Sequence, residues 1–404
     1  METSELPRLL YLADVPVESS YHGSALLYRL LQDYPVDRLL VIEPSAGRSQ
    51  FSRRLPDARY EQVSIRGARL IRTRLAALYS SVQFICSSVG MKKIDALLGS
   101  FQPEAVLTVA HACLWRTAAA FANRRQLPLH LICHDEITQM VPHLPALKGW
   151  VEQAFGDVYR ASASRFCVSP YMRDDYRARF GVDAQVLYPS RAADVPKYQV
   201  PPDHLASLPH GLRVAFAGTI NSPGHARLLQ DLASCLQSLG GKLLLYGPIT
   251  EEISRQVGLA LPNVELRGLL PSNVLIQTLR TEANLLYVPM SFEPQDRLAM
   301  KTNFPSKLAD YTAVGLPLLV QGPSDSSAAM WALENPGVAE VVTESSGEAL
   351  AQSLTKFAGD SARRLALGAK SLEVGHRFFA HDRARQMFQG GLRQGAKLAQ
   401  KSVP

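Results

Sequence analysis

The stretch LLYVPMSFEPQDRLAMKTNFPSKLADYTAVGLPLLVQG, residues 285–322, indicates the fold of this chain more clearly than any other part of it. It opens and closes with short apolar runs, Leu285–Val288 and Leu316–Val320. Runs of this length, bounded by proline or glycine, are typical of buried strands in a parallel sheet. The helical segment between them makes the predicted order strand, long loop, helix, strand.

The middle of this stretch predicts a phosphate site. Pro305 and Ser306 begin a helix that Gly315 ends, and we expect the Ser306 hydroxyl to cap its first turn. A helix start at the carboxyl edge of a parallel sheet presents unpaired amides and a partial positive charge, which favours phosphate. Lys307 adds a full positive charge, and Asp310, one turn later, can accept hydrogen bonds from sugar hydroxyls. Either residue alone also suits a solvated helix surface, but the ordered combination favours a phosphate site.

The run FPSKLADYTAVGLP resembles the nucleotide-sugar segment of GT-B glycosyltransferases, especially the family-4-like group that makes bacterial glycans. The resemblance implies that Phe304 and the helix start bind the donor diphosphate, and that Asp310 binds ribose hydroxyls. That family usually has a further acid eight positions before Asp310, where this chain has Thr302. The run VPMSFE matches the family's P-S-x-x-E pattern, so Glu293 is the expected counterpart, displaced by the insertion PQDRLAMKT.

Length and pattern together predict two α/β domains. A chain of 404 residues can build two substantial cores. Alternating strand and helix signals run through residues 1–190, stop in the proline-rich segment 191–211, and resume over 212–382. We therefore expect an N-terminal Rossmann-like domain, a linker, and a C-terminal Rossmann-like domain. The resemblance implies that the N-terminal domain binds the acceptor and the C-terminal domain binds the nucleotide sugar. The resemblance implies that the two face each other across a cleft, as in GT-B, and that a C-terminal helix at about 383–400 crosses back to the first domain.

In the N-terminal half, two predicted strands end in histidine, at His111 and His134. Strand ends of one parallel sheet share an edge, and histidine there can donate a hydrogen bond or take up a proton. A structural role for either histidine is the alternative. Both match strand-end histidines of the resembled family, which implies contact with the sugar donor. Gly23 follows the first strand in a predicted loop and resembles the family's glycine loop near the donor phosphate, although such a glycine is also common in simple turns.

In the C-terminal half, Gly218 and Thr219 close the first predicted strand, where glycine permits close approach of a phosphate to the backbone. Arg267 lies where the resembled family presents main-chain groups to the nucleobase. The chain has no G-x-G-x-x-G fingerprint, so a dinucleotide cofactor is not indicated. We expect no cofactor beyond the nucleotide-sugar co-substrate and no metal, since no D-x-D pair or C-x-x-C pattern suggests one.

A basic span covers residues 48–93, and the chain has a net charge of +7. Part of the span reads as an amphipathic helix, whose basic face could contact anionic lipid or an acidic acceptor, or could simply be solvated. Without aromatic interleaving or a known binding module, nucleic acid is not an expected partner. The chain has no signal-peptide pattern or long apolar run. We expect a cytoplasmic protein, at most peripheral to the inner face of the membrane.

These patterns predict a glycosyltransferase that moves a sugar from a nucleotide-diphosphate donor, by default a UDP-sugar, to a hydroxyl of a glycan, lipid-linked or small-molecule acceptor. The resemblance favours retention of anomeric configuration without a metal. The predicted catalytic residues are His134, His111 and Glu293. A sugar-nucleotide isomerase of the 2-epimerase kind uses the same layout and is one alternative. The other is an inactive, transferase-derived binding module, which the missing acid at Thr302 would explain.

Overall fold

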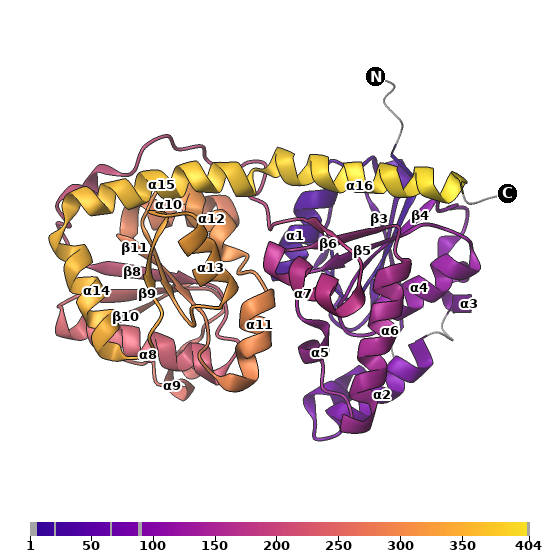
Figure 1. The fold of residues 1–404 in the computed structure, drawn as a ribbon, viewed down its shortest axis with the longest axis horizontal. Coiled ribbons are helices and arrows are strands. Elements are labelled where there is room, and N and C mark those ends of the chain that lie inside the picture. The colour runs from indigo at the N-terminus through magenta and orange to yellow at the C-terminus, as the bar shows by residue number, and fades with distance from the viewer. Residues whose placement is uncertain (1–5, 20–21, 65–66, 88–90, 402–404) are drawn as a thin grey trace. The chain divides into compact units, whose positions relative to one another are not determined.

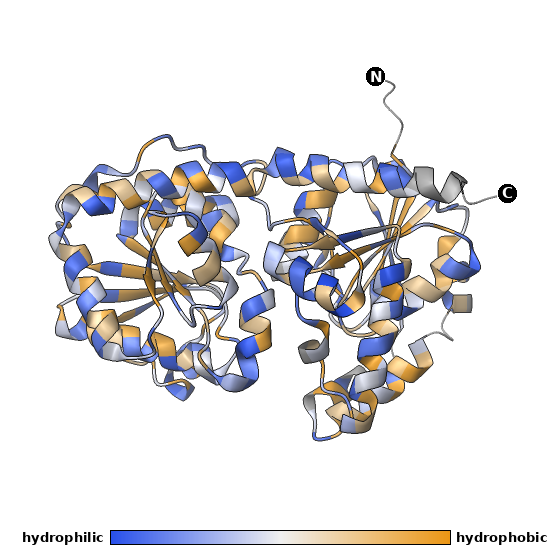
Figure 2. Cartoon of the chain, viewed as in Figure 1, coloured by the Kyte–Doolittle hydropathy of each residue, from blue (hydrophilic) through white to orange (hydrophobic). Residues whose placement is uncertain are grey.

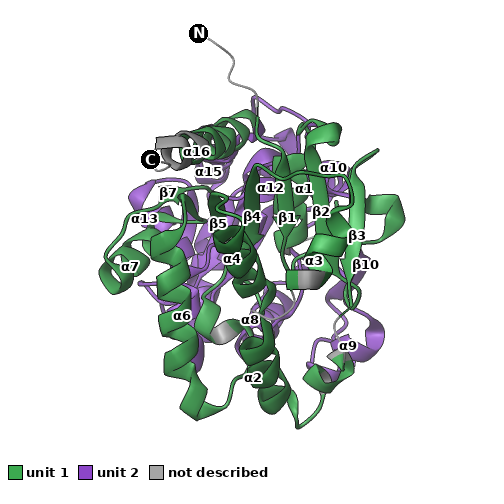
Figure 3. Ribbon diagram, turned by 90° about the vertical axis from the view of Figure 1, so that its right-hand side faces the viewer, with its two compact units in different colours: residues 1–188, 382–404 green, residues 189–381 purple. Residues whose placement is uncertain are grey.

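The computed structural model describes residues 6–19, 22–64, 67–87 and 91–401. The chain divides into two compact units. Unit 1 comprises residues 1–188 and 382–404, and unit 2 comprises residues 189–381 (Figure 3). Each unit contains one parallel sheet flanked by helices (Figure 1). The α/β class and the two Rossmann-like units are confirmed.

The sheet of unit 1 has seven parallel strands in the order β3-β2-β1-β4-β5-β6-β7. Chain order reverses between β1 and β4, as in other doubly wound sheets, where ligands bind outside the carboxyl ends of the strands. The strands are β1 (Leu9–Leu12), β2 (Leu39–Pro44), β3 (Arg59–Val63), β4 (Ala105–Val109), β5 (Leu129–Cys133), β6 (Ser164–Cys167) and β7 (Gln185–Val186).

The helices of unit 1 connect these strands and are supplemented by short 3₁₀ turns. The α-helices are α1 (His22–Leu31), α2 (Ala76–Cys86), α3 (Met91–Leu98), α4 (Leu114–Arg124), α5 (Ile137–Met140), α6 (Lys148–Ala161) and α7 (Pro170–Phe180). The 3₁₀ turns are η1 (Val36–Arg38), η2 (Phe51–Arg53), η3 (Ala68–Arg72) and η5 (Pro145–Leu147).

The sheet of unit 2 has six parallel strands in the order β10-β9-β8-β11-β12-β13. The strands are β8 (Arg213–Ala217), β9 (Lys242–Tyr246), β10 (Val264–Gly268), β11 (Leu285–Pro289), β12 (Leu318–Gln321) and β13 (Ala339–Val342). The helices and turns are η6 (Asp203–Ala206), α8 (Pro223–Ser238), α9 (Glu251–Gln256), α10 (Ser272–Glu282), η7 (Pro294–Asp296), α11 (Arg297–Thr302), α12 (Lys307–Val314), α13 (Ser327–Glu334), α14 (Gly347–Gly359) and α15 (Ser361–Phe379).

The apolar runs that open and close residues 285–322 form neighbouring central strands of the unit 2 sheet. β11 and β12 pair in parallel, with Leu286 opposite Leu318 and Val288 opposite Val320, and both are buried along their whole length. Helices cover both faces of this sheet, so its central strands are predominantly apolar, and Figure 2 colours much of these strands as hydrophobic. The strand predictions for this stretch are confirmed.

The segment 191–211, expected to be a linker, lies in unit 2 and packs on it. Leu205 is fully buried, and His204 Nε2 lies 2.9 Å from the carbonyl oxygen of Ala283. The Arg364 guanidinium donates to the carbonyl of Leu205, and the Arg191 amide donates to that of Phe379. The polar, proline-rich composition correctly indicates a segment that forms no strand. This segment nevertheless makes tertiary contacts with the rest of unit 2.

The last helix, α16 (His381–Lys401), packs on the unit 1 sheet from Asp382 onward. Phe388 is buried, and its ring centroid lies 5.8 Å from that of Phe166 in β6. Gly391 and Gly395 lie so close to Phe166 and His130 that an added Cβ would collide with either ring. These small residues let the helix approach the sheet.

Candidate functional site

Three neighbouring strands of unit 2 end in glycines that have positive φ. Gly218, Gly247 and Gly268 have φ values of 145°, 141° and 72°, and they follow or end β8, β9 and β10. Their backbones are in contact. The Gly247 amide donates a hydrogen bond to the carbonyl oxygen of Gly268, and a Cβ on Gly247 would collide with the carbonyl oxygen of Gly218. L-residues with side chains rarely adopt such φ values, so glycine is required at this edge of the sheet. At these three positions the edge of the sheet therefore presents backbone atoms without side chains.

Lys307, the first residue of α12, lies at this edge. Its Nζ lies 3.7 Å from the centroid of the Phe216 ring and 3.4 Å from where a Cβ on Gly218 would stand. Within the described residues, no carboxylate lies within ion-pair distance of Lys307. Burial lowers the pKa of Lys307 to about 7, because protein surrounds the ammonium although the residue as a whole keeps some exposure. The structure therefore brings Lys307 and Gly218 together.

The predicted cap at Ser306 is wrong. Ser306 has helical backbone angles, φ −58° and ψ −25°, and its side chain makes no capping hydrogen bond. A capping residue needs extended angles to turn its hydroxyl toward the first-turn amides. The amides of Leu308 and Ala309 are instead bonded to the carbonyls of Pro305 and Ser306. The amides of Ser306 and Lys307 have no partner in the described part of the chain, so these two are available to an anion.

His225, in the first turn of α8, lies close enough to Lys307 for the two charges to interact. Neither ring nitrogen has a hydrogen-bond partner among the described residues, and both are buried. Burial, followed by the charge of Lys307, lowers the pKa of His225 to about 4, whereas Asp296 acts in the opposite direction. A neutral imidazole can still donate one hydrogen bond. Thr219 and Asn221, between β8 and this helix, are hydrogen-bonded to each other.

Asp310 and Arg267 lie in the same unit, and their side chains are held by neighbours. Asp310 Oδ2 accepts a hydrogen bond of 3.1 Å from Ser272 Oγ, at the first residue of α10. Arg267 pairs with Glu265 and Glu282, at 2.8 and 3.1 Å. The guanidinium of Arg267 is thus engaged within unit 2, and main-chain atoms at this turn are what remains for a ligand.

The insertion after Glu293 folds into η7 and α11. Thr302 is fully buried at the end of α11, and its hydroxyl donates to the carbonyl of Leu298, so it does not occupy the place of a solvent-facing acid. Glu293 forms an ion pair with Arg227 of α8. Gly224, at the start of α8, lies against Ser291 and Glu293, and a Cβ there would collide with Ser291. Glu293 therefore lies beside the first turn of α8, which also carries His225.

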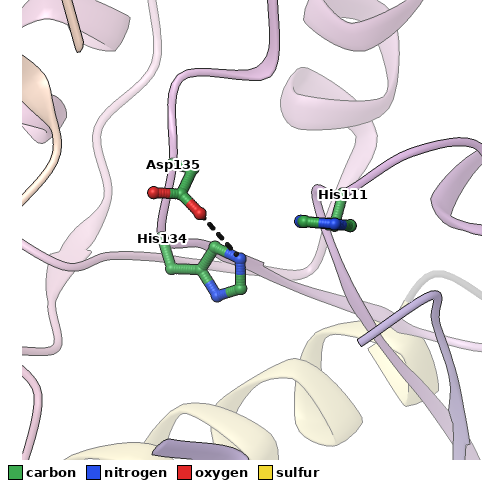
Figure 4. Close-up of side chains that lie close together, drawn as sticks. All are labelled: His111, His134 and Asp135. Atoms are coloured by element: carbon green, nitrogen blue, oxygen red, sulfur yellow. Dashed lines mark ion pairs between the residues drawn. The ribbon is translucent and has the colours of Figure 1, made fainter. Parts of the chain in front are cut away.

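In unit 1, His111 and His134 follow β4 and β5 and lie together at the end of the sheet (Figure 4). Their ring centroids are 5.7 Å apart, and His134 Nε2 lies 3.2 Å from Oδ2 of Asp135. Burial, and then the neighbouring His134, lowers the pKa of His111 to about 4. The ligand atoms of the three residues lie within 4.8 Å of one another, a spacing that also suits a metal ion.

Gly23 lies in the first turn of α1, which begins at His22, and not in a loop as predicted. A Cβ on Gly23 would stand 2.5 Å from Cε1 of His134. Glycine is therefore needed here so that the His134 ring can pack against the helix. This contact connects two residues that the sequence suggested separately.

Asp14, which sequence reasoning missed, lies half-buried after β1 and accepts hydrogen bonds from the amides of Cys113 and Leu114 at the start of α4. Burial raises its pKa to about 6, although the two amides oppose this. Asp14 and His111 line a cavity of about 480 Å³ within unit 1, together with residues of η3 and α2. The position of Asp14, two residues after the first strand, could have identified it from the sequence. Its hydrogen-bond partners at the start of α4 could not have been identified in that way.

No family model matches this sequence, and neither does any curated protein compared with it. Solved structures do match over almost the whole chain. The structure of Anabaena HepE in complex with UDP-glucose superposes with a TM-score of 0.67 at 15% identity, covering 95% of this chain and 99% of that one. Sucrose-phosphate synthase from Thermosynechococcus elongatus gives 0.65 at 13% identity, covering 96% and 98%.

A third match is trehalose-6-phosphate synthase from Burkholderia multivorans, with a TM-score of 0.64 at 14% identity, covering 98% of this chain and 100% of that one. Identities this low establish the fold alone. The chain has the GT-B fold, and that prediction is confirmed. Among the described residues, no helix has both the length and the apolar character needed to cross a bilayer.

If this site holds the diphosphate of a nucleotide sugar, as proposed below, that binding should weaken as pH rises above about 7, by up to about tenfold per pH unit. Burial lowers the pKa of Lys307 to about 7, so the free protein loses this charge above that pH, whereas a bound diphosphate would favour the protonated form. Below about pH 6 the affinity should be flat. Isothermal calorimetry between about pH 5 and 9 measures this, and Lys307→Ala should give a weak affinity that no longer changes with pH. An unchanged slope in that variant would contradict the assignment.

Proposed function

We propose that this protein is a glycosyltransferase that moves a sugar from a nucleotide-diphosphate donor, by default a UDP-sugar, to an acceptor hydroxyl. The observation that carries the proposal is the buried ammonium of Lys307 beside Gly218, without a carboxylate partner in the described residues. A buried cation is costly unless an anion neutralises it, and the adjoining amides of Ser306 and Lys307 suit the same anion. The fold shared with UDP-glucose-bound HepE also supports a UDP-sugar.

Catalysis on this proposal is mainly electrostatic. As the bond to the sugar breaks, negative charge grows on the leaving diphosphate, and preorganised donors lower the energy of that state. Lys307, the helix-start amides and the backbone at Gly218-Thr219 are the donors we assign. We assign Asp310 to the ribose hydroxyls and Glu293, which Arg227 holds in place, to hydroxyls of the donor sugar.

In unit 1 we assign His134 and His111 to hydroxyls of the reacting sugars. Asp135 lies 3.2 Å from His134 and keeps the ring in one orientation, and the low pKa of His111 leaves that ring neutral near pH 7. A neutral imidazole can donate at one nitrogen and accept at the other. These assignments leave the acceptor's identity open, because many acceptors offer a hydroxyl.

The proposal is tested by a thermal-shift screen with UDP, GDP and ADP and with their glucose esters. A ligand that binds only the folded protein raises the melting temperature by mass action. We expect the largest shift with one of these diphosphates or its sugar, and no shift with glucose alone. Absence of a shift with all of them would overturn the proposal. Interconversion of a sugar nucleotide without any acceptor would favour the isomerase instead.

We further propose that transfer proceeds with retention, as the family resemblance implies. We also propose that it needs no metal ion, since Lys307 and the amides supply the positive charge. We expect about the same rate of UDP release after dialysis against EDTA, with added Mg²⁺ as the comparison. A loss of activity that a divalent ion restores would instead assign His111, His134 and Asp135 as ligands. The anomeric proton signals of the product measure the stereochemical outcome directly.

A further inference from the structure

The turn η7, which belongs to the insertion after Glu293, lies against the first turn of α8. The Asp296 amide donates a hydrogen bond of 2.9 Å to the carbonyl oxygen of Glu293 and so closes the turn. The Glu293 side chain forms an ion pair with Arg227 of α8, and a Cβ on Gly224 would stand 3.0 Å from Cγ of Glu293. These contacts hold the end of η7, where Asp296 stands, beside the start of α8.

The carboxylate of Asp296 has no protein partner. Its Oδ2 atom is buried and accepts no hydrogen bond from the described residues, and none of their lysines or arginines lies within ion-pair distance of it. Glu293 differs in this respect, because Arg227 compensates its charge. A buried carboxylate oxygen without a hydrogen bond is costly, and a hydroxyl of a bound ligand would offset that cost.

The imidazole of His225 lies close to both Asp296 and Lys307. Burial is the main reason that the pKa of His225 falls to about 4; the charge of Lys307 adds to the fall, and that of Asp296 opposes it. Both charges are therefore within interaction range of the ring. Neither of its buried nitrogens has a partner in the part of the chain that the structure describes. The neutral ring can donate one hydrogen bond and accept another.

His225 therefore connects Asp296 to the ammonium that we assign to the donor diphosphate. In a sugar nucleotide the sugar is bonded to the outer phosphate, so its hydroxyls reach the groups that surround the phosphate site. A carboxylate accepts hydrogen bonds from hydroxyls but repels a second carboxylate, and repulsion of this kind is an effective way to reject a wrong ligand. Thr302 is not available for this role, because it is buried and its hydroxyl donates to the carbonyl of Leu298.

We infer that Asp296 and His225 bind hydroxyls of the donor sugar beside its diphosphate, and that Asp296 makes the site select a neutral sugar over a uronic acid. Asp296 acts next to Glu293, whose charge is already compensated by Arg227 and therefore discriminates less. The inference rests on the proposed function, since it takes the site at Lys307 as that of the diphosphate.

Isothermal calorimetry with UDP, UDP-glucose and UDP-glucuronic acid tests this inference. The unchanged protein should bind UDP-glucose about tenfold or more tightly than UDP-glucuronic acid. Asp296→Asn keeps the size of the side chain and removes its charge, so this ratio should fall to about one. The ratio is the readout because a general effect on the diphosphate cancels in it. His225→Phe removes both ring nitrogens, and it should weaken UDP-glucose about fivefold relative to UDP.

A matched control is Asp203→Asn, the same change at an exposed aspartate of η6 in unit 2, which should leave all three affinities unaltered. Near-ultraviolet circular dichroism checks that each variant is folded. Equal affinity of the unchanged protein for the two sugar nucleotides would overturn the inference, and so would a ratio that Asp296→Asn does not change. In either case binding of UDP would leave the proposed function intact. Absence of binding by UDP and both esters would overturn the UDP-sugar assignment and this inference with it.

Discussion

Replacing Lys307 by alanine is expected to weaken the binding of the preferred nucleotide diphosphate by about 100-fold. The loss corresponds to about 3 kcal/mol, the usual scale for removing one partner of a buried, hydrogen-bonded charge pair. The unliganded protein should fold normally, because the ammonium is buried against Phe216 without an ion-pair partner among the described residues. Isothermal calorimetry of the variant with UDP measures the loss.

The control for this change is Lys356→Ala, which removes an exposed lysine from α14 of the same unit. It should bind UDP as the unchanged protein does. Lys307→Arg keeps the charge but enlarges the side chain beside Gly218, so it should recover only part of the affinity. Full affinity in Lys307→Ala would show that the diphosphate binds elsewhere, and the proposed donor site would then be wrong.

Replacing Gly247 by alanine is expected to destabilise unit 2 by about 4 kcal/mol. Two costs add: a φ of 141°, which residues with a Cβ rarely adopt, and a collision of that Cβ with the carbonyl oxygen of Gly218. The neighbour is backbone and cannot rotate away. Since Gly218 would have to shift, the variant should also bind UDP poorly even at temperatures where it stays folded.

The comparison for this prediction is Gly268→Ala, on the neighbouring strand. Gly268 also has positive φ, 72°, but a Cβ there would have no atom within 4 Å. The expected destabilisation is about 1 kcal/mol, the cost of the backbone conformation alone. Differential scanning calorimetry of the full chain measures both. Equal effects from the two variants would mean that the contact between Gly247 and Gly218 is unimportant.

Local sequence was sufficient for the strands of the central stretch and for the position of Lys307. Apolar runs bounded by proline and glycine allow few other structures, and a lysine at a helix start is visible in the sequence. Local sequence was insufficient for the cap of α12. Ser306 is a residue type that commonly caps helices, but its backbone is helical and its side chain makes no capping hydrogen bond. Composition also suggested a linker where unit 2 has tertiary contacts at Leu205 and His204.

The sequence by itself determined that the chain forms two parallel α/β units, because hydrophobic periodicity and glycine positions are local properties. It also determined which residue types stand at the strand ends. Only the tertiary structure decided which of them meet: Gly23 against His134, and Lys307 against Phe216 and Gly218. It alone placed Asp14 against the amides at the start of α4 and directed Thr302 into the core. Some of these outcomes depend on contacts between residues that are about 90 or more positions apart in the sequence. Others depend on the orientation of a whole helix. No local sequence pattern contains either kind of information.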